Sequence, residues 1–268
     1  MENFRIQLYR NYPQVARAVE ILVADYNAVI SSAKIGTLEI ESFFGKMHFN
    51  KGSQTFDNNL SVHAMSSVLG MLESYIAWDK VDGSCLVYDY YIDKTDRVRV
   101  TQMENGERSV HNTRKVPLNH KDFLYTTSDG WELSDYILRV NMKLEIEDTA
   151  PADIKRFESV KISTRKAFTI QSSNVPTISY KFDVIHYWTG KTLKEAEDSM
   201  MNAEPRRTIE CEIVNIPTDN SLSDKDKFLM FASMLMKMQD FLEYPTCYES
   251  AVEKNYSIQT PGVFTLVQ

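Results

Sequence analysis

Two short acidic runs lie near opposite ends of this chain. The first places Glu39 and Glu41 two residues apart between apolar neighbours, and the second places Glu210 and Glu212 in the same way. Because side chains alternate across a β-strand, each glutamate pair shares one face and its apolar neighbours occupy the other. Carboxylate oxygens on neighbouring strands are ligands that hard divalent cations prefer. The runs therefore predict two strands whose acidic faces meet either water or a metal ion.

Basic residues with strand-like spacing lie between the two acidic runs. Arg97 and Arg99 alternate with valines, and further strand-like stretches carry Arg114, Lys115, Arg139, Lys143, Lys161, Arg165 and Lys166. Guanidinium groups bind phosphate oxygens in bidentate geometry, and a lysine adds a point charge. In a closed antiparallel barrel lined by both signs, the charges would compensate one another, which makes their burial tolerable. Acidic strands near the ends and basic strands between them suggest one site for a polyanion.

These strands resemble those of the triphosphate tunnel metalloenzymes, and within that family the metal-dependent mRNA-capping RNA 5′-triphosphatases of fungi and large DNA viruses. The likeness runs in the expected order from about Gly36 to Asn215. Residues 37–45 look like the opening Glu-x-Glu strand, and residues 209–213 look like the closing acidic strand. Between them, residues 97–100, 112–116 and 136–147 are similar to the arginine-rich strand, the next basic strand and the strand that ends in a water-orienting glutamate.

The resemblance implies a reaction and a role for individual residues. The reaction removes the γ-phosphate from the 5′-triphosphate end of nascent RNA as the first step of capping, with Mg²⁺ or Mn²⁺ as cofactor. The implied metal ligands are Glu39, Glu41 and Glu212, with Glu210 acting through water or a basic neighbour. The implied catalytic residues are Glu145, which orients the attacking water, and Arg97, Arg99 and Arg165. The implied substrate-binding residues are Arg114, Lys115, Arg139, Lys143, Lys161, Lys166 and Asp183.

Three positions depart from the family pattern. Ser163 stands where a central lysine is usual, Thr208 where the closing strand often has its first glutamate, and Ile185 where a threonine is usual. Three alternatives therefore stay open. A related tunnel enzyme could hydrolyse inorganic tripolyphosphate or a small triphosphate. The barrel could bind polyphosphate or RNA ends without catalysis, if Ser163 marks lost activity. The chain could also be a structural capping subunit that docks a guanylyltransferase through a terminal helix.

Helical and strand-like periodicities predict an α+β fold, an antiparallel β-barrel braced by several helices, and the resemblance implies that this barrel is closed. Helices are expected at residues 13–32, 61–76, 191–203 and 224–242, and strands across 85–147 with a hairpin turn at Asn105 and Gly106. At 268 residues the chain can form one domain with a sizeable core. We expect a single domain over 1–268, with the helices at 13–32 and 224–242 packed outside the barrel.

Composition narrows the function further. A net charge of −7 disfavours nonspecific nucleic-acid binding over the whole surface, so an RNA would be held by its triphosphate end. Three cysteines without paired spacing argue against zinc and fit an intracellular compartment, either the cytoplasm or nucleus or, for a virus, the site of viral transcription or the virion. No apolar stretch of the sequence is long enough to span a bilayer, so no membrane partner is expected. A nucleoside triphosphate, a separate guanylyltransferase and a homodimer are compatible with this picture.

One competing motif begins at Lys80. Residues 80–83 read Lys-Val-Asp-Gly, which resembles the Lys-x-Asp-Gly of nucleotidyltransferases. The Glu-Gly pair that such enzymes need is absent, and the only later Lys-x-Lys, at residues 225–227, opens a predicted helix. A turn after the second helix is the simpler interpretation. The sequence also lacks a Walker A loop, a Gly-x-Ser-x-Gly elbow and a His-Glu-x-x-His zinc motif.

Overall fold

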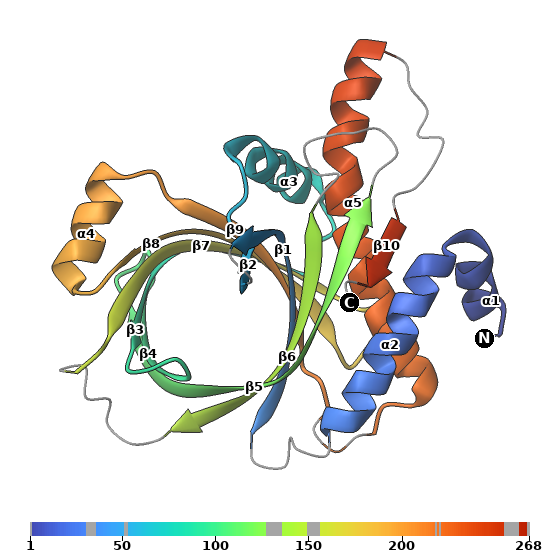
Figure 1. Ribbon diagram of the computed structural model, residues 1–268, viewed down its shortest axis with the longest axis horizontal. Helices are drawn as coiled ribbons and strands as arrows, with labels where there is room; N and C mark the ends of the chain where they lie inside the picture. Colours follow the sequence, from blue (N-terminus) through green and yellow to red (C-terminus); the bar gives the residue numbers. More distant parts are fainter. Residues whose placement is uncertain are drawn as a thin grey trace.

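Eight strands form a closed antiparallel ring, which Figure 1 shows end-on. The computed structural model describes residues 2–30, 36–50, 53–126, 136–148, 156–217, 219, 221–254 and 263–266. Within these residues the barrel strands are β1 (Thr37–Asn50), β3 (Lys80–Tyr91), β4 (Asp96–Gln102), β5 (Arg108–Thr126), β6 (Ile137–Asp148), β7 (Ser159–Gln171), β8 (Ser179–Gly190) and β9 (Arg206–Val214). The predicted closed antiparallel barrel is confirmed.

The ring runs in the order β1, β6, β5, β4, β3, β7, β8 and β9, and β9 pairs with β1 to close it. Two further strands lie outside this order: β2 (Ser53–Asp57) pairs with β1, and β10 (Val263–Leu266) pairs with β5. Closure brings the first and the last barrel strands of the chain side by side. The two acidic runs, far apart in sequence, therefore become neighbours.

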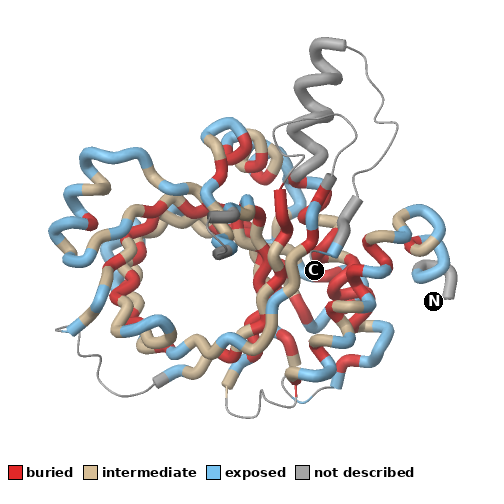
Figure 2. The backbone as a smooth tube through the Cα atoms, viewed as in Figure 1, coloured by how far each residue is buried: buried red, intermediate tan, exposed pale blue. Residues whose placement is uncertain are grey.

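The hydrophobic core lies outside the barrel, between its outer wall and the helices. On β1, Leu38 and Ile40 are buried in this core, whereas the glutamates that alternate with them belong to the inner face. The helices α2 (Pro13–Val29), α3 (Val62–Ser74) and α5 (Asp224–Lys254) gather on one side of the barrel, and α4 (Leu193–Asn202) covers the other (Figure 1). In Figure 2 the chain is buried where α2 and α5 meet the barrel wall. Apolar alternation thus leaves the barrel interior for polar side chains.

Local sequence signals explain several helix boundaries. The hydroxyl of Ser61 accepts a hydrogen bond from the backbone N–H of Ala64 at 3.1 Å, which caps α3. Thr192 caps α4 in the same way through the N–H of Glu195 at 3.2 Å. A short helix, α1 (Glu2–Asn11), precedes α2, which starts at Pro13 as expected.

Two expectations from the sequence, the end of the last helix and a turn at residues 80–83, differ from the structure. The last long helix, α5, begins at Asp224 as predicted but continues to Lys254. It extends beyond Leu242, the residue at which the apolar periodicity of the sequence ends. The turn expected at residues 80–83 is wrong, since these residues belong to β3, whose pairing with β7 shifts register between Asp82 and Cys85. Residues 31–32, at the end of the predicted first helix, lie outside the described residues.

The predicted hairpin turn at Asn105 and Gly106 lies between β4 and β5. Gly106 has a φ of 86°, a conformation that glycine adopts without strain. Among the helices that the structure describes, none is long and apolar enough to cross a membrane.

Candidate functional site

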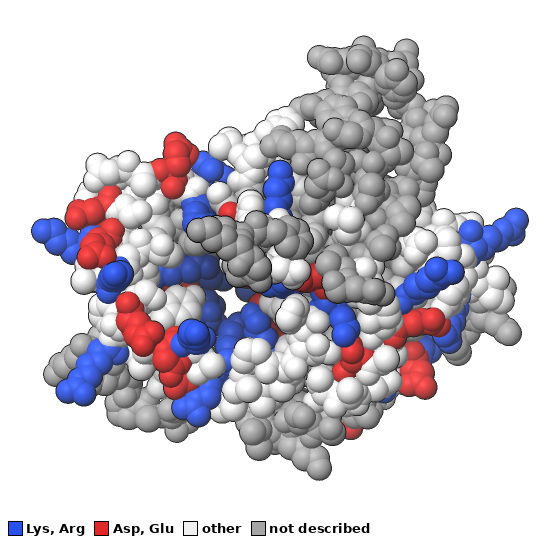
Figure 3. Space-filling view, in the orientation of Figure 1, with Lys and Arg blue, Asp and Glu red and all other residues white. Residues whose placement is uncertain are grey.

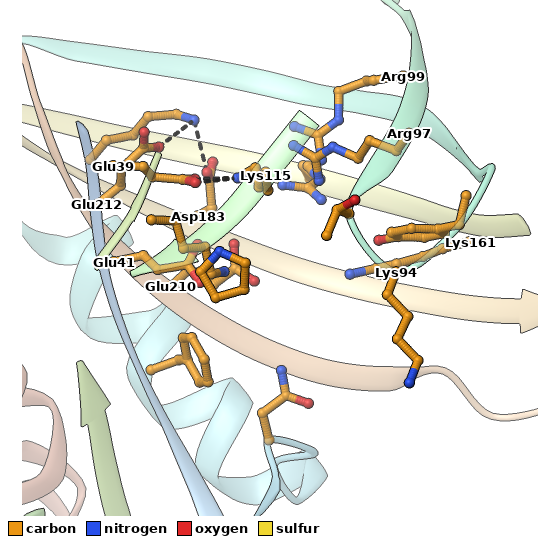
Figure 4. A pocket seen from close by; sticks show the side chains of 18 residues that line it. Glu39, Glu41, Lys94, Arg97, Arg99, Lys115, Lys161, Asp183, Glu210 and Glu212 are labelled. Carbon is orange, nitrogen blue, oxygen red and sulfur yellow. Dashed lines mark hydrogen bonds and ion pairs between the residues drawn. The ribbon is translucent and has the colours of Figure 1, made fainter. Parts of the chain in front are cut away.

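A cavity of about 330 Å³ lies inside the barrel and is lined mainly by charged side chains. Figure 3 shows lysine and arginine atoms gathered around its opening. The carboxylates that line it are Glu39, Glu41, Asp183, Glu210 and Glu212. The basic groups that line it are Lys94, Arg97, Arg99, Lys115, Lys143, Lys161, Arg165 and Lys181. Most of the residues predicted from the sequence as a polyanion site thus meet in one cavity (Figure 4).

The acidic wall is built by three adjacent strands. Glu41 on β1 lies opposite Glu212 on β9, and Glu210 on β9 lies opposite Asp183 on β8. Side chains in register on neighbouring strands of one face have Cβ atoms about 5 Å apart. The barrel closure therefore concentrates carboxylates from residues near both ends of the chain. We call these five side chains, Glu39, Glu41, Asp183, Glu210 and Glu212, the acidic wall.

Lysines neutralise much of this acidic wall. Lys115 donates hydrogen bonds to both carboxylate oxygens of Glu39, and Lys143 donates to Glu41. Lys181 lies 2.8 Å from Asp183 and 3.8 Å from Glu212. These pairs are the compensation that makes a charged interior tolerable.

Glu212 is a buried carboxyl group within this wall, and its pKa differs from the usual value. The pKa of Glu212 is raised to about 7, mainly by burial and in smaller part by the charges of Glu39 and Asp183, against the opposing effect of Lys181. A carboxyl group with this pKa is partly protonated at neutral pH. A bound cation would favour its ionised form.

The basic wall is organised around a buried aspartate that the sequence analysis missed. Asp89 on β3 has no exposed surface and accepts hydrogen bonds from Arg99 at 2.7 and 2.9 Å. Arg165 approaches the same carboxylate at 3.6 Å and Arg97 at 4.0 Å. Burial tends to raise the pKa of Asp89, but the arginine charges outweigh it and hold that pKa well below its usual range. One carboxylate therefore fixes three guanidinium groups, which we call the basic wall.

Glu145, the predicted water-orienting residue, lies beside the basic wall. Its carboxylate is 3.6 Å from the guanidinium of Arg97, and its backbone pairs with Lys115 on β5. It does not belong to the residues that line the cavity itself. Arg97 also donates a hydrogen bond to the hydroxyl of Thr113 at 3.2 Å. The arrangement places Glu145 next to a guanidinium group of the basic wall.

Three predicted substrate-binding residues are not brought to the cavity. Arg114 pairs with Asp96 at 2.6 and 3.0 Å, and Lys166 pairs with Glu73 at 2.6 Å. Arg114 directly precedes Lys115, and Lys166 directly follows Arg165. Because Lys115 and Arg165 line the cavity, strand alternation places Arg114 and Lys166 on the opposite face.

The third residue, Arg139, shares the inner face of β6 with Lys143 but lies nearer the strand's start. It donates hydrogen bonds to Asp122 at 2.7 and 2.8 Å, and its guanidinium lies 4.1 Å from the ring centre of Phe56. This guanidinium already has a carboxylate and an aromatic ring as partners. The predicted contact of Arg139 with substrate in the cavity is therefore not supported by its position.

Several cavity residues were not predicted from the sequence. Lys181 follows from the alternation that puts it on the same face as Asp183, so strand spacing could have identified it. Lys94 and Thr95 come from the turn between β3 and β4, where no periodicity applies. Ser163, at the usual lysine position, is buried and accepts a hydrogen bond from Arg165 at 3.3 Å. It supports the basic wall instead of lining the cavity.

The donor chemistry of the acidic wall fits a hard divalent cation. Its five carboxylates line one cavity, and carboxylate oxygens are preferred ligands of Mg²⁺ and Mn²⁺. In the part of the chain that the structure describes, no three acidic, histidine or cysteine side chains converge as a metal site. Each of Glu39, Glu41 and Asp183 is paired with a lysine.

Comparisons with known proteins identify the fold. No model of a known protein family and no curated protein sequence matches the chain. The solved structure of the S. pombe RNA triphosphatase Pct1 matches with a TM-score of 0.59 and 12% identity, over 85% of this chain and 93% of that chain. Pct1 in complex with the Spt5 CTD matches with a TM-score of 0.58 and 12% identity, over 85% and 92% of the two chains.

A viral structure gives a similar result. The RNA triphosphatase domain of a trifunctional mimivirus mRNA capping enzyme matches with a TM-score of 0.52 and 12% identity, over 83% of this chain and 96% of that chain. The sequence resemblance to triphosphate tunnel metalloenzymes and the structural comparison thus point to the same architecture. This chain has the fold of the fungal and mimivirus RNA triphosphatases, a closed antiparallel barrel.

Proposed function

We propose that this protein is a metal-dependent RNA 5′-triphosphatase. It removes the γ-phosphate from the triphosphate end of nascent RNA and leaves a diphosphate end for a separate intracellular guanylyltransferase. The observation that supports this proposal is the cavity in which an acidic wall faces a basic wall, inside the fold of known RNA triphosphatases. A polyphosphate is the ligand that can satisfy both walls at once.

The basic wall binds the phosphate oxygens. Arg97, Arg99 and Arg165 converge from two strands, and Asp89 holds them in place before any ligand arrives. Preorganised cationic groups stabilise the charge that develops on a transferring phosphoryl group without the cost of reorganisation. Lys161, on the same strand as Arg165, adds a further charge to this cavity.

The acidic wall holds the divalent metal ion through Glu39, Glu41 and Glu212, with Glu210 acting through water or a basic neighbour. When bound, Mg²⁺ or Mn²⁺ supplies charge neutralisation at the phosphate and orients it for in-line attack. Lys115 and Lys143 lie next to these carboxylates. When the metal ion takes the carboxylates as ligands, the two lysines are placed to contact phosphate oxygens. Glu145, beside Arg97, orients the attacking water.

A phosphate-release assay on three substrates tests this function. Triphosphate-ended RNA, a nucleoside triphosphate and inorganic tripolyphosphate are compared with Mg²⁺, with Mn²⁺ and with EDTA. We expect metal-dependent release and the highest kcat/KM on the RNA. A higher kcat/KM on tripolyphosphate would make the protein a small-molecule phosphohydrolase, and RNA binding without phosphate release would make it a binding module.

A further inference from the structure

Two aromatic side chains, Phe43 and Tyr91, line the charged cavity, and Phe43 lies on the same strand as Glu39 and Glu41 of the acidic wall. Phe43 follows Glu39 and Glu41 on the inner face of β1, and its ring is half-buried there. At a rise of about 3.4 Å per residue, Phe43 lies about 7 Å beyond Glu41 along the strand. The ring is separate from the hydrophobic core, which lies outside the barrel. Core packing therefore does not explain an aromatic residue at this position.

The ring of Phe43 is supported by a chain of contacts. Its centre lies 5.5 Å from that of Phe56 on β2, in a tilted arrangement. The guanidinium of Arg139 lies over Phe56, and Asp122 fixes that guanidinium with two hydrogen bonds. These contacts hold Phe43 in position before a ligand binds. A preorganised ring binds a flat partner with less loss of conformational entropy.

A cation accompanies this ring at the same cavity. Lys94 lines it from the β3–β4 turn, and its ammonium group points away from Glu39 and Glu212 (Figure 4). Lys94 is exposed, so it can reach a phosphodiester that lies outside the triphosphate. Its ammonium group would bind that phosphate as a point charge. Aromatic rings combined with basic side chains are the usual means of holding single-stranded nucleic acid.

We infer that Phe43 is the stacking platform for the base of the first RNA nucleotide, and that Lys94 pairs with the phosphodiester that follows it. This inference rests on the proposed function, since it assigns the nucleoside to the β1 position beyond the metal-binding glutamates. The RNA then enters the tunnel from the Phe43 side, with its triphosphate directed toward Glu41 and Glu39. Stacking is tolerant of base identity, which suits an enzyme that meets many transcripts.

A double-mutant cycle between protein and RNA tests the contact. The ligands are a short RNA with a 5′-triphosphate and the same RNA with an abasic first nucleotide, and binding is measured by fluorescence anisotropy without added metal, so that no hydrolysis intervenes. For the wild-type protein, loss of the base should weaken binding roughly 5- to 100-fold. For Phe43→Leu the same loss should change binding less than about twofold, and Phe43→Tyr should restore the wild-type difference.

Two controls separate this contact from general damage. Competition by inorganic tripolyphosphate should be unchanged in Phe43→Leu, because that ligand has no base to stack. Phe157→Leu removes a half-buried ring that packs on Tyr90 outside the barrel and should retain the wild-type response to the abasic RNA. Equal responses of wild type and Phe43→Leu to loss of the base would overturn the inference and leave the proposed function intact. A wild-type protein that binds neither triphosphate-ended RNA nor tripolyphosphate would overturn both.

Discussion

Asp89 receives two hydrogen bonds from Arg99, at 2.7 and 2.9 Å, at a point of the barrel wall with no exposed surface. Arg97 and Arg165 face the same carboxylate from the two strands that flank β3. Three guanidinium groups in one cavity would repel one another without this counter-charge. Asp89 is therefore a positioning residue for the basic wall.

Replacement of Asp89 by Asn should damage both stability and activity. The variant leaves three guanidinium groups without their buried counter-ion, a loss that typically costs about 3–5 kcal/mol. We expect a free energy of unfolding lower by that order and phosphate release reduced at least about 100-fold. Denaturant titration and steady-state kinetics below the melting temperature check this. Asp96→Asn, which breaks the more exposed pair with Arg114 outside the cavity, should cost less than about 1 kcal/mol.

The same carboxylate makes stability depend on pH in the acidic range. Because the pKa of Asp89 is lower in the folded protein than the value of about 3.9 in an unfolded chain, its contribution is present above about pH 4. That contribution is lost as the pH falls through the folded-state pKa. The difference in unfolding free energy between wild type and Asp89→Asn should therefore shrink below pH 4. A constant difference from pH 7 to pH 3 would contradict the assignment.

Removal of single charges from the acidic wall should abolish metal-dependent activity. Glu39→Gln, Glu41→Gln, Glu210→Gln and Glu212→Gln are each expected to lower phosphate release at least about 100-fold, because each weakens the proposed metal site. Metal titrations should show weaker activation, and thermal melts should show which variants stay folded. Glu147→Gln, on β6 but away from this cavity, serves as the control. Four folded variants with normal turnover would refute the tunnel mechanism.

Glu145 distinguishes catalysis from binding. A side chain that orients water contributes to the chemical step and little to ground-state binding, so Glu145→Gln should lower single-turnover hydrolysis while triphosphate-ended RNA still binds. The carboxamide keeps a polar contact to Arg97, which lies 3.6 Å away. Rapid-quench kinetics and equilibrium binding of the same preparation provide the two measurements. Unchanged hydrolysis would exclude the catalytic role.

The charge of Lys161 should make the affinity for a polyphosphate depend on pH above neutrality. The pKa of Lys161 is lowered to about 8, mainly by burial and in smaller part by Arg165, against the opposing effect of Glu210. As the pH rises from 7 to 9 the free protein loses this positive charge, so the affinity for a polyphosphate end should fall. Lys161→Arg keeps its charge over the whole range and should show a flatter profile. Identical pH profiles for the two proteins would show that another group titrates.

The sequence predicted the barrel and most of its lining because strand alternation links residue spacing to a face. It correctly grouped Glu39 with Glu41 and Arg97 with Arg99, and the order of acidic and basic strands along the chain suggested that they line one site. Alternation does not say which face is inside. For that reason Arg114 was grouped with its neighbour Lys115, although adjacent residues of a strand cannot both face the cavity.

Asp89 could not be predicted from strand alternation, because its role depends on tertiary pairing. It is a lone acid between Tyr88 and Tyr90, and its meaning depends on β3 lying between β4 and β7 in the ring. That adjacency follows from tertiary pairing and leaves no local signal. Lys94 was missed because turn residues have no periodicity to read.

Closure of the ring also sets the order in which the protein can assemble during synthesis. The hydroxyl of Ser42 donates a hydrogen bond to the carbonyl of Cys211, 169 residues later in the chain. Strands β1 and β9 therefore cannot meet until almost the whole barrel has left the ribosome, and such distant pairings slow folding. Until then β1 presents an open edge, a site at which nascent chains can associate wrongly. The acidic wall is complete only at this last step, so a chain arrested before β9 lacks the proposed metal site as well as a closed barrel.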